Sequence, residues 1–288
     1  MSQPEPTPAQ STFAGLTLAD IVQPGWRVAP RVRALVSTRN GGVSLPPYGR
    51  WNDGVDRPGG LNLGRLAGDD PLCVAENRAR LLALTGGAEA AWLEQIHGAE
   101  VVDAHEVLGR ARAGAPLVRA DASVTNQPGT ICVVMIADCM PVLLCDADGR
   151  AVGAAHAGWR GLAAGVVEKT VQRVAGLAGA QPGSLHAYLG PSIGPDAFEV
   201  GPDVRDAFMN GVDGSQREAT AQAFVPRPGS PGKYLADLPA LARLRLQRLG
   251  VTHITGDDLC TVTARERFYS YRRDRVTGRM AAMIWLAD

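Results

Sequence analysis

Apolar positions along this chain recur with two different periods, which predict a mixture of strands and helices. Alternating or continuous apolar runs of four to eight residues are typical of strands, and apolar residues spaced three and four apart are typical of helices. Strands are expected at residues 31–39, 91–96, 100–104, 129–135, 141–145, 151–155, 185–189 and 279–285. Helices are expected at residues 71–84, 162–178, 203–209 and 238–249.

Polar and turn-forming residues separate these segments. Asp69 or Asp70 can cap the first helix, and Gly250 suits the position just after the last one. A turn is expected at 40–42, an ordered loop at 46–64 and a surface loop at 210–233. The polar, proline-rich residues 1–25 are expected to form a flexible N-terminal arm.

The order of the expected elements indicates a fold class. Strands and helices alternate without a regular β-α-β period, and neither an internal repeat nor a domain boundary follows the arm. We therefore predict one α/β (α+β) domain over residues 26–288. A chain of this length buries a sizeable core in a single domain.

Composition excludes several classes of function. The 29 basic and 29 acidic residues balance, so no basic field is available to hold a nucleic acid, and no basic amphipathic helix suggests a membrane surface. The five cysteines include no CxxC pair and no signal peptide pattern is visible, so a cytoplasmic location with free thiols is expected. The apolar run 131–145 is too short to span a bilayer. We expect a monomer or a weak dimer.

Three segments each place one residue of a metal-ligand type beside a glycine or at the end of an apolar run. The residues are His97 in LEQIHG, Cys139 in ADCMP and His156 in HAGWRG. Taken singly, each is more often structural than a ligand. Taken together they favour one metal site, because imidazole and thiolate bind zinc well and three protein ligands leave the fourth position open, as in catalytic sites.

Other residues are candidates for catalysis and substrate binding. Asp138, beside Cys139 between two apolar runs, is the first candidate to move a proton, and Glu94 is the next. The crowded aromatics and arginines at 268–274 could bind a planar, anionic ligand. The candidate substrate-binding residues are Arg39, Asn62, Arg160, Arg272 and Arg273, of which the first two lie in patterns slightly more typical of plain turns.

The motifs QxHG, ADCxP, HAGWRG, GPSIGP, EVG and YSYRRDxxTGRM occur in this order from about residue 30 to the C-terminus. This combination resembles the YfiH-like family, also called the laccase-domain or multicopper polyphenol oxidoreductase family. The resemblance implies a single domain of stacked α-β-β-α layers, similar to the Cys–His fold of toxin deamidases. It also implies metal ligands at His97, Cys139 and His156, with zinc as the usual metal and copper claimed for oxidase activity.

The activities implied by the resemblance are purine nucleoside phosphorolysis, adenosine deamination and 5′-methylthioadenosine cleavage, with purine nucleosides and phosphate as partners. One bacterial branch resembles a peptidoglycan-editing amidase that releases L-Ser from a UDP-MurNAc precursor. Copper-dependent polyphenol oxidation is the weaker alternative, because five histidines are too few for a multicopper laccase. The chain departs from many relatives at Ala197-Phe198 and Ala242, where they carry Cys-Tyr and Asn, which bears on substrate preference.

Three kinds of mechanism stay open at this point. A zinc ion with three protein ligands is a Lewis acid that supports deamination and amide hydrolysis. Cys139 could instead be a nucleophile with a histidine as its base and no metal. Phosphorolysis needs a held phosphate, for which the arginines and the helix start at Gly161 are suitable in type. A metal-binding module without catalysis would require a fourth ligand, and none is evident.

Overall fold

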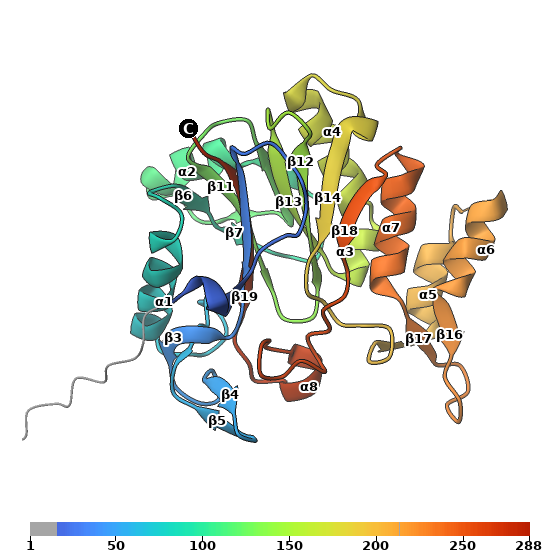
Figure 1. The fold of residues 1–288 in the computed structure, drawn as a ribbon. Coiled ribbons are helices and arrows are strands. Elements are labelled where there is room, and N and C mark those ends of the chain that lie inside the picture. The colour runs from blue at the N-terminus through green and yellow to red at the C-terminus, as the bar shows by residue number, and fades with distance from the viewer. Residues whose placement is uncertain (1–15, 213) are drawn as a thin grey trace, which may run out of the picture.

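Two β-sheets pack face to face, and helices cover both outer faces (Figure 1). The computed structural model describes residues 16–212 and 214–288. The layers run α-β-β-α, which confirms the predicted architecture.

The five-stranded sheet is covered by helix α1 (Pro71–Ala83). Its strand order is β1 (Ile21–Val22), β2 (Val32–Ser37), β19 (Met280–Leu286), β11 (Thr130–Ile136) and β6 (Glu89–Ala91). Successive side chains of a strand point to opposite faces. In β19, Met280, Ala282 and Ile284 therefore face the core between the sheets, whereas Ala281 and Met283 pack in the cluster beside α1.

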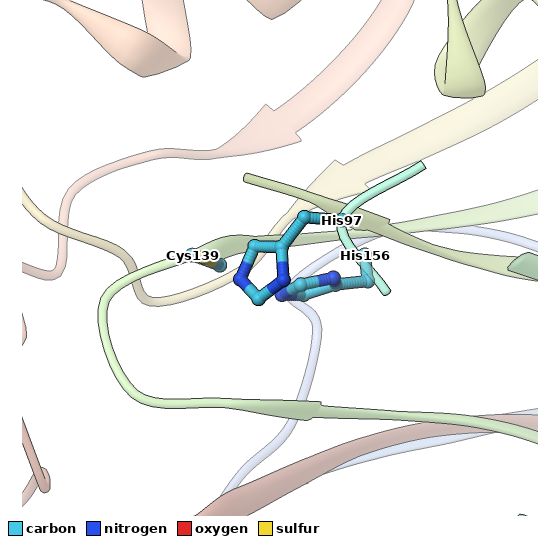
Figure 2. A group of neighbouring side chains, drawn as sticks. All are labelled: His97, Cys139 and His156. Atoms are coloured by element: carbon cyan, nitrogen blue, oxygen red, sulfur yellow. The ribbon is translucent and has the colours of Figure 1, made fainter. Parts of the chain in front are cut away.

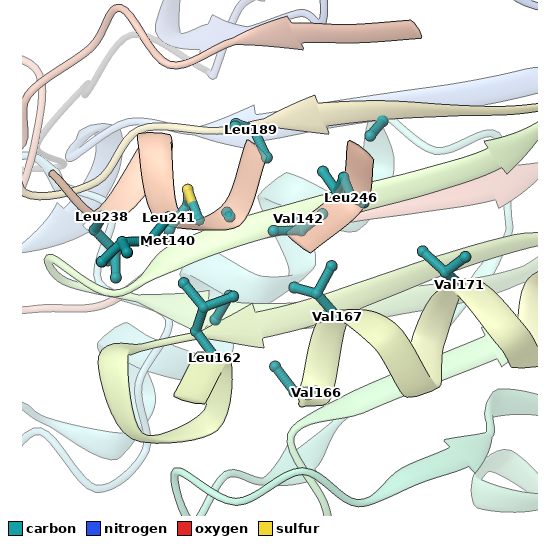
Figure 3. Close-up of a cluster of buried hydrophobic side chains, with 14 of the residues drawn as sticks. Met140, Val142, Leu162, Val166, Val167, Val171, Leu189, Leu238, Leu241 and Leu246 are labelled. Carbon is teal, nitrogen blue, oxygen red and sulfur yellow. The ribbon is translucent and has the colours of Figure 1, made fainter. Parts of the chain in front are cut away.

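The six-stranded sheet is covered by helices α4 (Val166–Ala178) and α7 (Leu238–Arg248). Its strand order is β18 (His253–Gly256), β14 (Leu185–Leu189), β12 (Met140–Asp146), β13 (Val152–Ala157), β10 (Ala122–Thr125) and β8 (Val101–Asp103). Figure 3 shows the buried cluster on this face, in which aliphatic side chains of α4 and α7 meet those of the sheet. Beneath these helices, β12 and β13 pair in antiparallel register.

The remaining elements surround this sandwich. The short helices are η1 (Leu18–Asp20), α2 (Ala104–Arg112), α3 (Trp159–Ala163), η2 (Pro182–Ser184), α5 (Pro202–Met209), α6 (Gly214–Gln222) and α8 (Tyr271–Asp274). The short strands are β3 (Asn40–Ser44), β4 (Arg50–Asn52), β5 (Val55–Arg57), β7 (Leu93–Glu94), β9 (Val118–Arg119), β15 (Glu199–Val200), β16 (Phe224–Pro226) and β17 (Tyr234–Ala236). None of the helices in the described ranges combines the length and apolar character that crossing a membrane requires.

The expected helices at 71–84 and 238–249 are confirmed, and Asp70 caps the first by accepting a hydrogen bond from Leu72 N at 2.8 Å. The expected helix at 162–178 is instead two helices, α3 and α4, because Gly165 takes a φ of +89° between them. The expected strand at 100–104 ends at Asp103, whose side chain caps α2, a helix that the sequence prediction missed.

Several expected loops also contain regular structure. The turn at 40–42 lies inside β3, the loop at 46–64 includes the β4–β5 hairpin, and the loop at 210–233 includes α6 and β16. The polar sequence of α6 has no apolar stripe by which it could be recognised. The strand at 91–96 is divided between β6 and β7. Residues 1–15 of the expected arm lie outside the described residues, whereas 18–22 form η1 and β1, which pairs with β2.

Candidate functional site

His97, Cys139 and His156 come from three separate segments that meet at one rim of the sandwich. His97 follows β7, and Cys139 lies in the turn that leads from β11 to β12. His156 lies in β13, where it is paired with Pro141 of the neighbouring strand β12. Their ligand-type atoms all lie within 4.8 Å of one another. Figure 2 shows the two imidazole rings side by side with Cys139 next to them; the ring centroids are 4.8 Å apart.

The geometry of the three side chains suits a divalent metal ion. Zinc bonds of about 2.0–2.3 Å in a tetrahedral site place ligand atoms roughly 3–4 Å apart. The observed separations need only a small inward shift to meet this requirement. Two imidazoles and one thiolate are a donor set that zinc prefers, so these residues fit the ion that the sequence predicts.

Two glycines of the HAGWRG segment allow the chain to approach this closely. A Cβ atom on Gly158 would lie 2.7 Å from Cys139 Sγ, and one on Gly161 would lie 2.7 Å from the carbonyl oxygen of Gly98. Any larger residue at either position would therefore push the three segments apart. His156 itself lies in β13, which extends beyond the expected strand end at residue 155.

A fully buried carboxylate, Asp121, holds both histidines in place. Its side chain accepts hydrogen bonds from the backbone N–H groups of Ile96, His97 and Gly98 at 3.2, 2.8 and 2.7 Å. Its Oδ1 atom also lies 2.9 Å from Nδ1 of His156, which leaves Nε2 of that ring to face the other two ligands. The sequence analysis missed Asp121; its only signal is an acid directly before the short buried strand β10 (Ala122–Thr125).

Cys139 and His156 also stabilise each other's charged form. Burial alone raises the pKa of the Cys139 thiol, but the charge of His156 and hydrogen bonds from both histidines outweigh burial and lower it to about 6. Burial alone lowers the pKa of His156, but the charge of Cys139 and the hydrogen bond to Asp121 raise it to about 9. Without a metal the two groups therefore form a thiolate–imidazolium pair: the thiol is already ionised, and His156 loses its proton when a metal binds.

A cavity of about 460 Å³ opens beside these three residues. Its aromatic lining residues are Trp92, Trp159, Phe198 and Tyr271, and its cationic ones are Arg65, Arg78, Arg160, Arg272 and Arg279. A larger cavity of about 760 Å³ lies near Trp26 and Trp285. The larger cavity has no metal-ligand cluster among the residues described, so the candidate site is the smaller one.

The structure divides the predicted substrate-binding residues into two groups. Arg160 and Arg272 line the cavity, whereas Arg39, Asn62 and Arg273 do not. Arg39 is only 1% exposed, because its guanidinium donates to the Gly49 carbonyl and pairs with Asp56 at 2.8 Å. The donors of Arg39 therefore already have partners within the protein, and its predicted role in substrate binding stays a prediction.

Asn62 and Arg273 also have structural partners instead of a place in the cavity. The fully buried Asn62 accepts hydrogen bonds from Gly64 N and Arg279 N through Oδ1, so it fixes the loop beside the cavity. Arg273 pairs with Asp274 at 2.7 Å. Its guanidinium also donates to the carbonyl oxygens of Thr261, Val262 and Phe268.

The two predicted proton-transfer residues both line the cavity but differ in their contacts. Asp138, at a φ of +96°, accepts hydrogen bonds from Thr261 Oγ1 and Arg272 N, both at 2.6 Å. These bonds anchor the turn that presents Cys139 and engage both carboxylate oxygens. Glu94 is exposed and its Oε1 lies 3.5 Å from Arg119 Nε.

Adjacent arginines 272 and 273 offer a matched test of this division. We expect Arg272→Ala to raise the KM for the substrate about tenfold with little change in metal content, because the substitution removes a cation from the cavity wall. Arg273→Ala should instead lower Tm while leaving KM nearly unchanged, because it removes hydrogen bonds that join 261–274. Steady-state kinetics, elemental analysis and thermal melts of both variants check this; equal KM effects would contradict it.

Comparison with known proteins identifies the family and the fold. The family model of the multi-copper polyphenol oxidoreductase laccases matches residues 33–287. The chain belongs to this family. The match spans all the residues that build the candidate site, so the site belongs to the family's own domain.

Curated relatives in the family cover nearly the whole chain. A purine nucleoside phosphorylase YfiH of Escherichia coli K12 is 49% identical over 270 residues, which span 93% of this chain and 100% of the relative. A purine nucleoside phosphorylase of Haemophilus influenzae is 42% identical over 92% of this chain and 98% of its own length. The family resemblance expected from the motifs is thereby confirmed.

Solved structures of the family have the same fold. A Neisseria meningitidis protein superposes with a TM-score of 0.81 at 45% identity, covering 93% of this chain and all of the neighbour. YlmD from Geobacillus stearothermophilus superposes with a TM-score of 0.80 at 29% identity, covering 96% and 99%. The α-β-β-α sandwich is therefore common to relatives of quite different sequence.

Proposed function

We propose that this chain is a zinc-dependent purine nucleoside phosphorylase with adenosine deaminase and methylthioadenosine phosphorylase activity. The observation that carries the proposal is one cavity that joins the His97–Cys139–His156 cluster to aromatic and arginine-rich walls. The names of the relatives support the phosphorylase assignment. The metal and the two additional activities rest on the cavity and on the resemblance of the motifs.

In this proposal the three residues would hold the zinc ion, which when bound would supply a Lewis acid at the cavity wall. Asp121 would keep His156 in the tautomer that presents Nε2, and its bonds to the backbone would keep the His97 turn rigid. Asp138 would hold the Cys139 turn against α8. Preorganised ligands of this kind avoid reorganisation during the reaction.

The walls of the cavity would bind the two reactants. Trp159 and Phe198 lie in the cavity wall with the guanidinium groups of Arg160 and Arg272 over their rings, 4.3 and 5.4 Å from the ring centroids. A purine would stack on these aromatic–guanidinium pairs. In phosphorolysis, a phosphate oxygen forms a bond to the sugar C1′ while the C1′–N9 bond breaks and its electron pair leaves with the purine. The exposed side chains of Leu66 and Leu117 in the lining would accept an apolar 5′-methylthio group.

The metal-replete enzyme is expected to release hypoxanthine from inosine only when phosphate is supplied, and to make inosine from adenosine without it. Phosphate is the nucleophile of the first reaction, whereas water is that of the second. Chromatography of the purine products, with and without phosphate, makes the comparison. If neither reaction occurs while serine is released from a UDP-MurNAc precursor, the amidase function replaces this one.

A further inference from the structure

Arg78 is a buried cation on the wall of the cavity beside His97, Cys139 and His156, and no acid among the described residues pairs with its side chain. The residue is only 8% exposed although it carries a full positive charge. Its Nε atom donates to the Leu63 carbonyl at 2.9 Å, and Nη2 lies 3.7 Å from Met135 Sδ. Within residues 16–212 and 214–288, no carboxylate lies within 4.0 Å of its guanidinium.

Burying this positive charge costs free energy unless an anion lies beside it. Burial, and then the nearby charge of Arg65, lower the pKa of Arg78 to about 10, so the side chain is still protonated at neutral pH. Removing an ionised group from water without a counter-charge is strongly unfavourable. The exposed Arg65 adds a second positive charge on the same flank, which increases that cost.

The guanidinium of Arg78 is nevertheless held in a fixed orientation. Its Cζ atom lies 3.7 Å from the ring centroid of Trp92, so the planar group stacks on the indole. A guanidinium has five N–H donors, of which the contacts with Leu63 and Met135 engage two. The remaining donors form a rigid fork, which is the geometry that recognises a tetrahedral oxyanion.

A third arginine is anchored on the loop that holds Arg78. Leu63 of this loop accepts the hydrogen bond from Arg78, and a Cβ atom on Gly64 would lie 2.7 Å from Cγ of Arg279. Asn62 Oδ1 accepts the hydrogen bond from Arg279 N at 2.8 Å. The loop therefore fixes Arg78 and Arg279 together at the cavity.

The charge of the cavity lining favours an anion on this flank. Its five arginines face only two acids, Glu94 and Asp138, and the carboxylate of Asp138 already accepts two hydrogen bonds. Of the other arginines, Arg160 stacks on Trp159 and Arg272 donates to the Glu199 carbonyl at 2.9 Å. The flank of Arg65 and Arg78 thus offers the least compensated positive charge.

We propose that Arg78, with Arg65 and Arg279, forms a subsite for a phosphate group inside this cavity. The choice of phosphate as a reactant rests on the proposed phosphorylase function, whereas the anion-binding geometry does not. The group could be inorganic phosphate or the phosphoryl group of a phosphorylated nucleoside, because both present the same oxygens to the guanidinium.

The subsite is tested by calorimetric titration of the metal-replete protein with inorganic phosphate and, separately, with adenosine 5′-monophosphate. Arg78→Met keeps an unbranched side chain beside Trp92 and Met135, and should weaken binding of the preferred ligand roughly 10- to 100-fold. Arg65→Met, at the exposed rim where folding is not at risk, should weaken it several-fold. Arg110→Met makes the same change of charge on the exposed face of α2 and should leave binding unchanged.

The possible results distinguish failure of the Arg78 subsite from failure of the proposed phosphorylase function. Binding of either ligand that is weakened roughly 10- to 100-fold in Arg78→Met and several-fold in Arg65→Met, with metal content intact, supports the subsite even if no phosphorolysis is detected. Binding of inorganic phosphate identifies the free ion as the occupant, and binding of the monophosphate alone identifies a phosphorylated substrate. Equal affinity for each ligand in the unaltered protein and in both variants, or no binding of either ligand to the unaltered protein, overturns the subsite. Phosphorolysis of inosine that persists with such a result leaves the phosphorylase function standing.

Discussion

Cys139→Ala is expected to abolish metal binding and, with it, both phosphorolysis and deamination. The residue supplies the single thiolate of the cluster, and the two remaining imidazoles would hold a metal much more weakly. Since changes to groups behind the ligands already cost about 10–100-fold in metal affinity, loss of a ligand should exceed this range. Elemental analysis and a chelator competition measure the metal, and product chromatography measures both reactions.

The matched control is Cys73→Ala, which removes a thiol from α1 at a position away from the cavity. It should retain full metal content and activity. Three results would contradict the expectation for Cys139→Ala. Undiminished zinc with lost activity would favour a nucleophilic thiol without a metal. Undiminished zinc with full activity would remove Cys139 from the site. Retained phosphorolysis with lost deamination would show that the two reactions do not share one centre.

Asp121→Ala is expected to lower metal affinity by about 10–100-fold, although it leaves the side chains of His97, Cys139 and His156 unchanged. The substitution removes the hydrogen bond to His156 Nδ1 and leaves the N–H groups of Ile96, His97 and Gly98 without their acceptor. The same loss should lower the free energy of unfolding of the metal-free protein by about 3–5 kcal/mol. Metal titration and chemical denaturation measure the two effects separately.

Two further variants distinguish positioning from a general loss of stability. Asp121→Asn keeps the shape and one carbonyl acceptor, so we expect it to recover part of the metal affinity. Asp103→Ala removes the cap of α2 and should cost about 1 kcal/mol of stability with no change in metal affinity. If Asp121→Ala is destabilised but binds metal as tightly as the unaltered protein, Asp121 does not position the ligands.

The three residues of the His97–Cys139–His156 cluster could be chosen from local sequence, because each lies in a short segment with its own signal. His156, Gly158 and Gly161 share one segment of six residues, and the glycines are required by the close approach of Cys139 and Gly98. The apolar strands and the longer helices were also predictable, since their periods are properties of continuous segments. The polar helix α6 was not, because it carries no apolar stripe.

Whether an arginine or an acid reaches the site was decided only by the tertiary structure. The sequence analysis proposed Arg39 and not Arg78 for substrate binding. In the structure Arg39 is paired with Asp56, whereas Arg78 lines the cavity and no carboxylate among residues 16–212 and 214–288 lies within 4.0 Å of its guanidinium. Asp121 has no motif of its own, and it meets His156 only because β10 pairs with β13. Local patterns determine which segments form and which can hold a ligand, whereas burial and charge pairing depend on contacts between segments far apart in the chain, which no local pattern records.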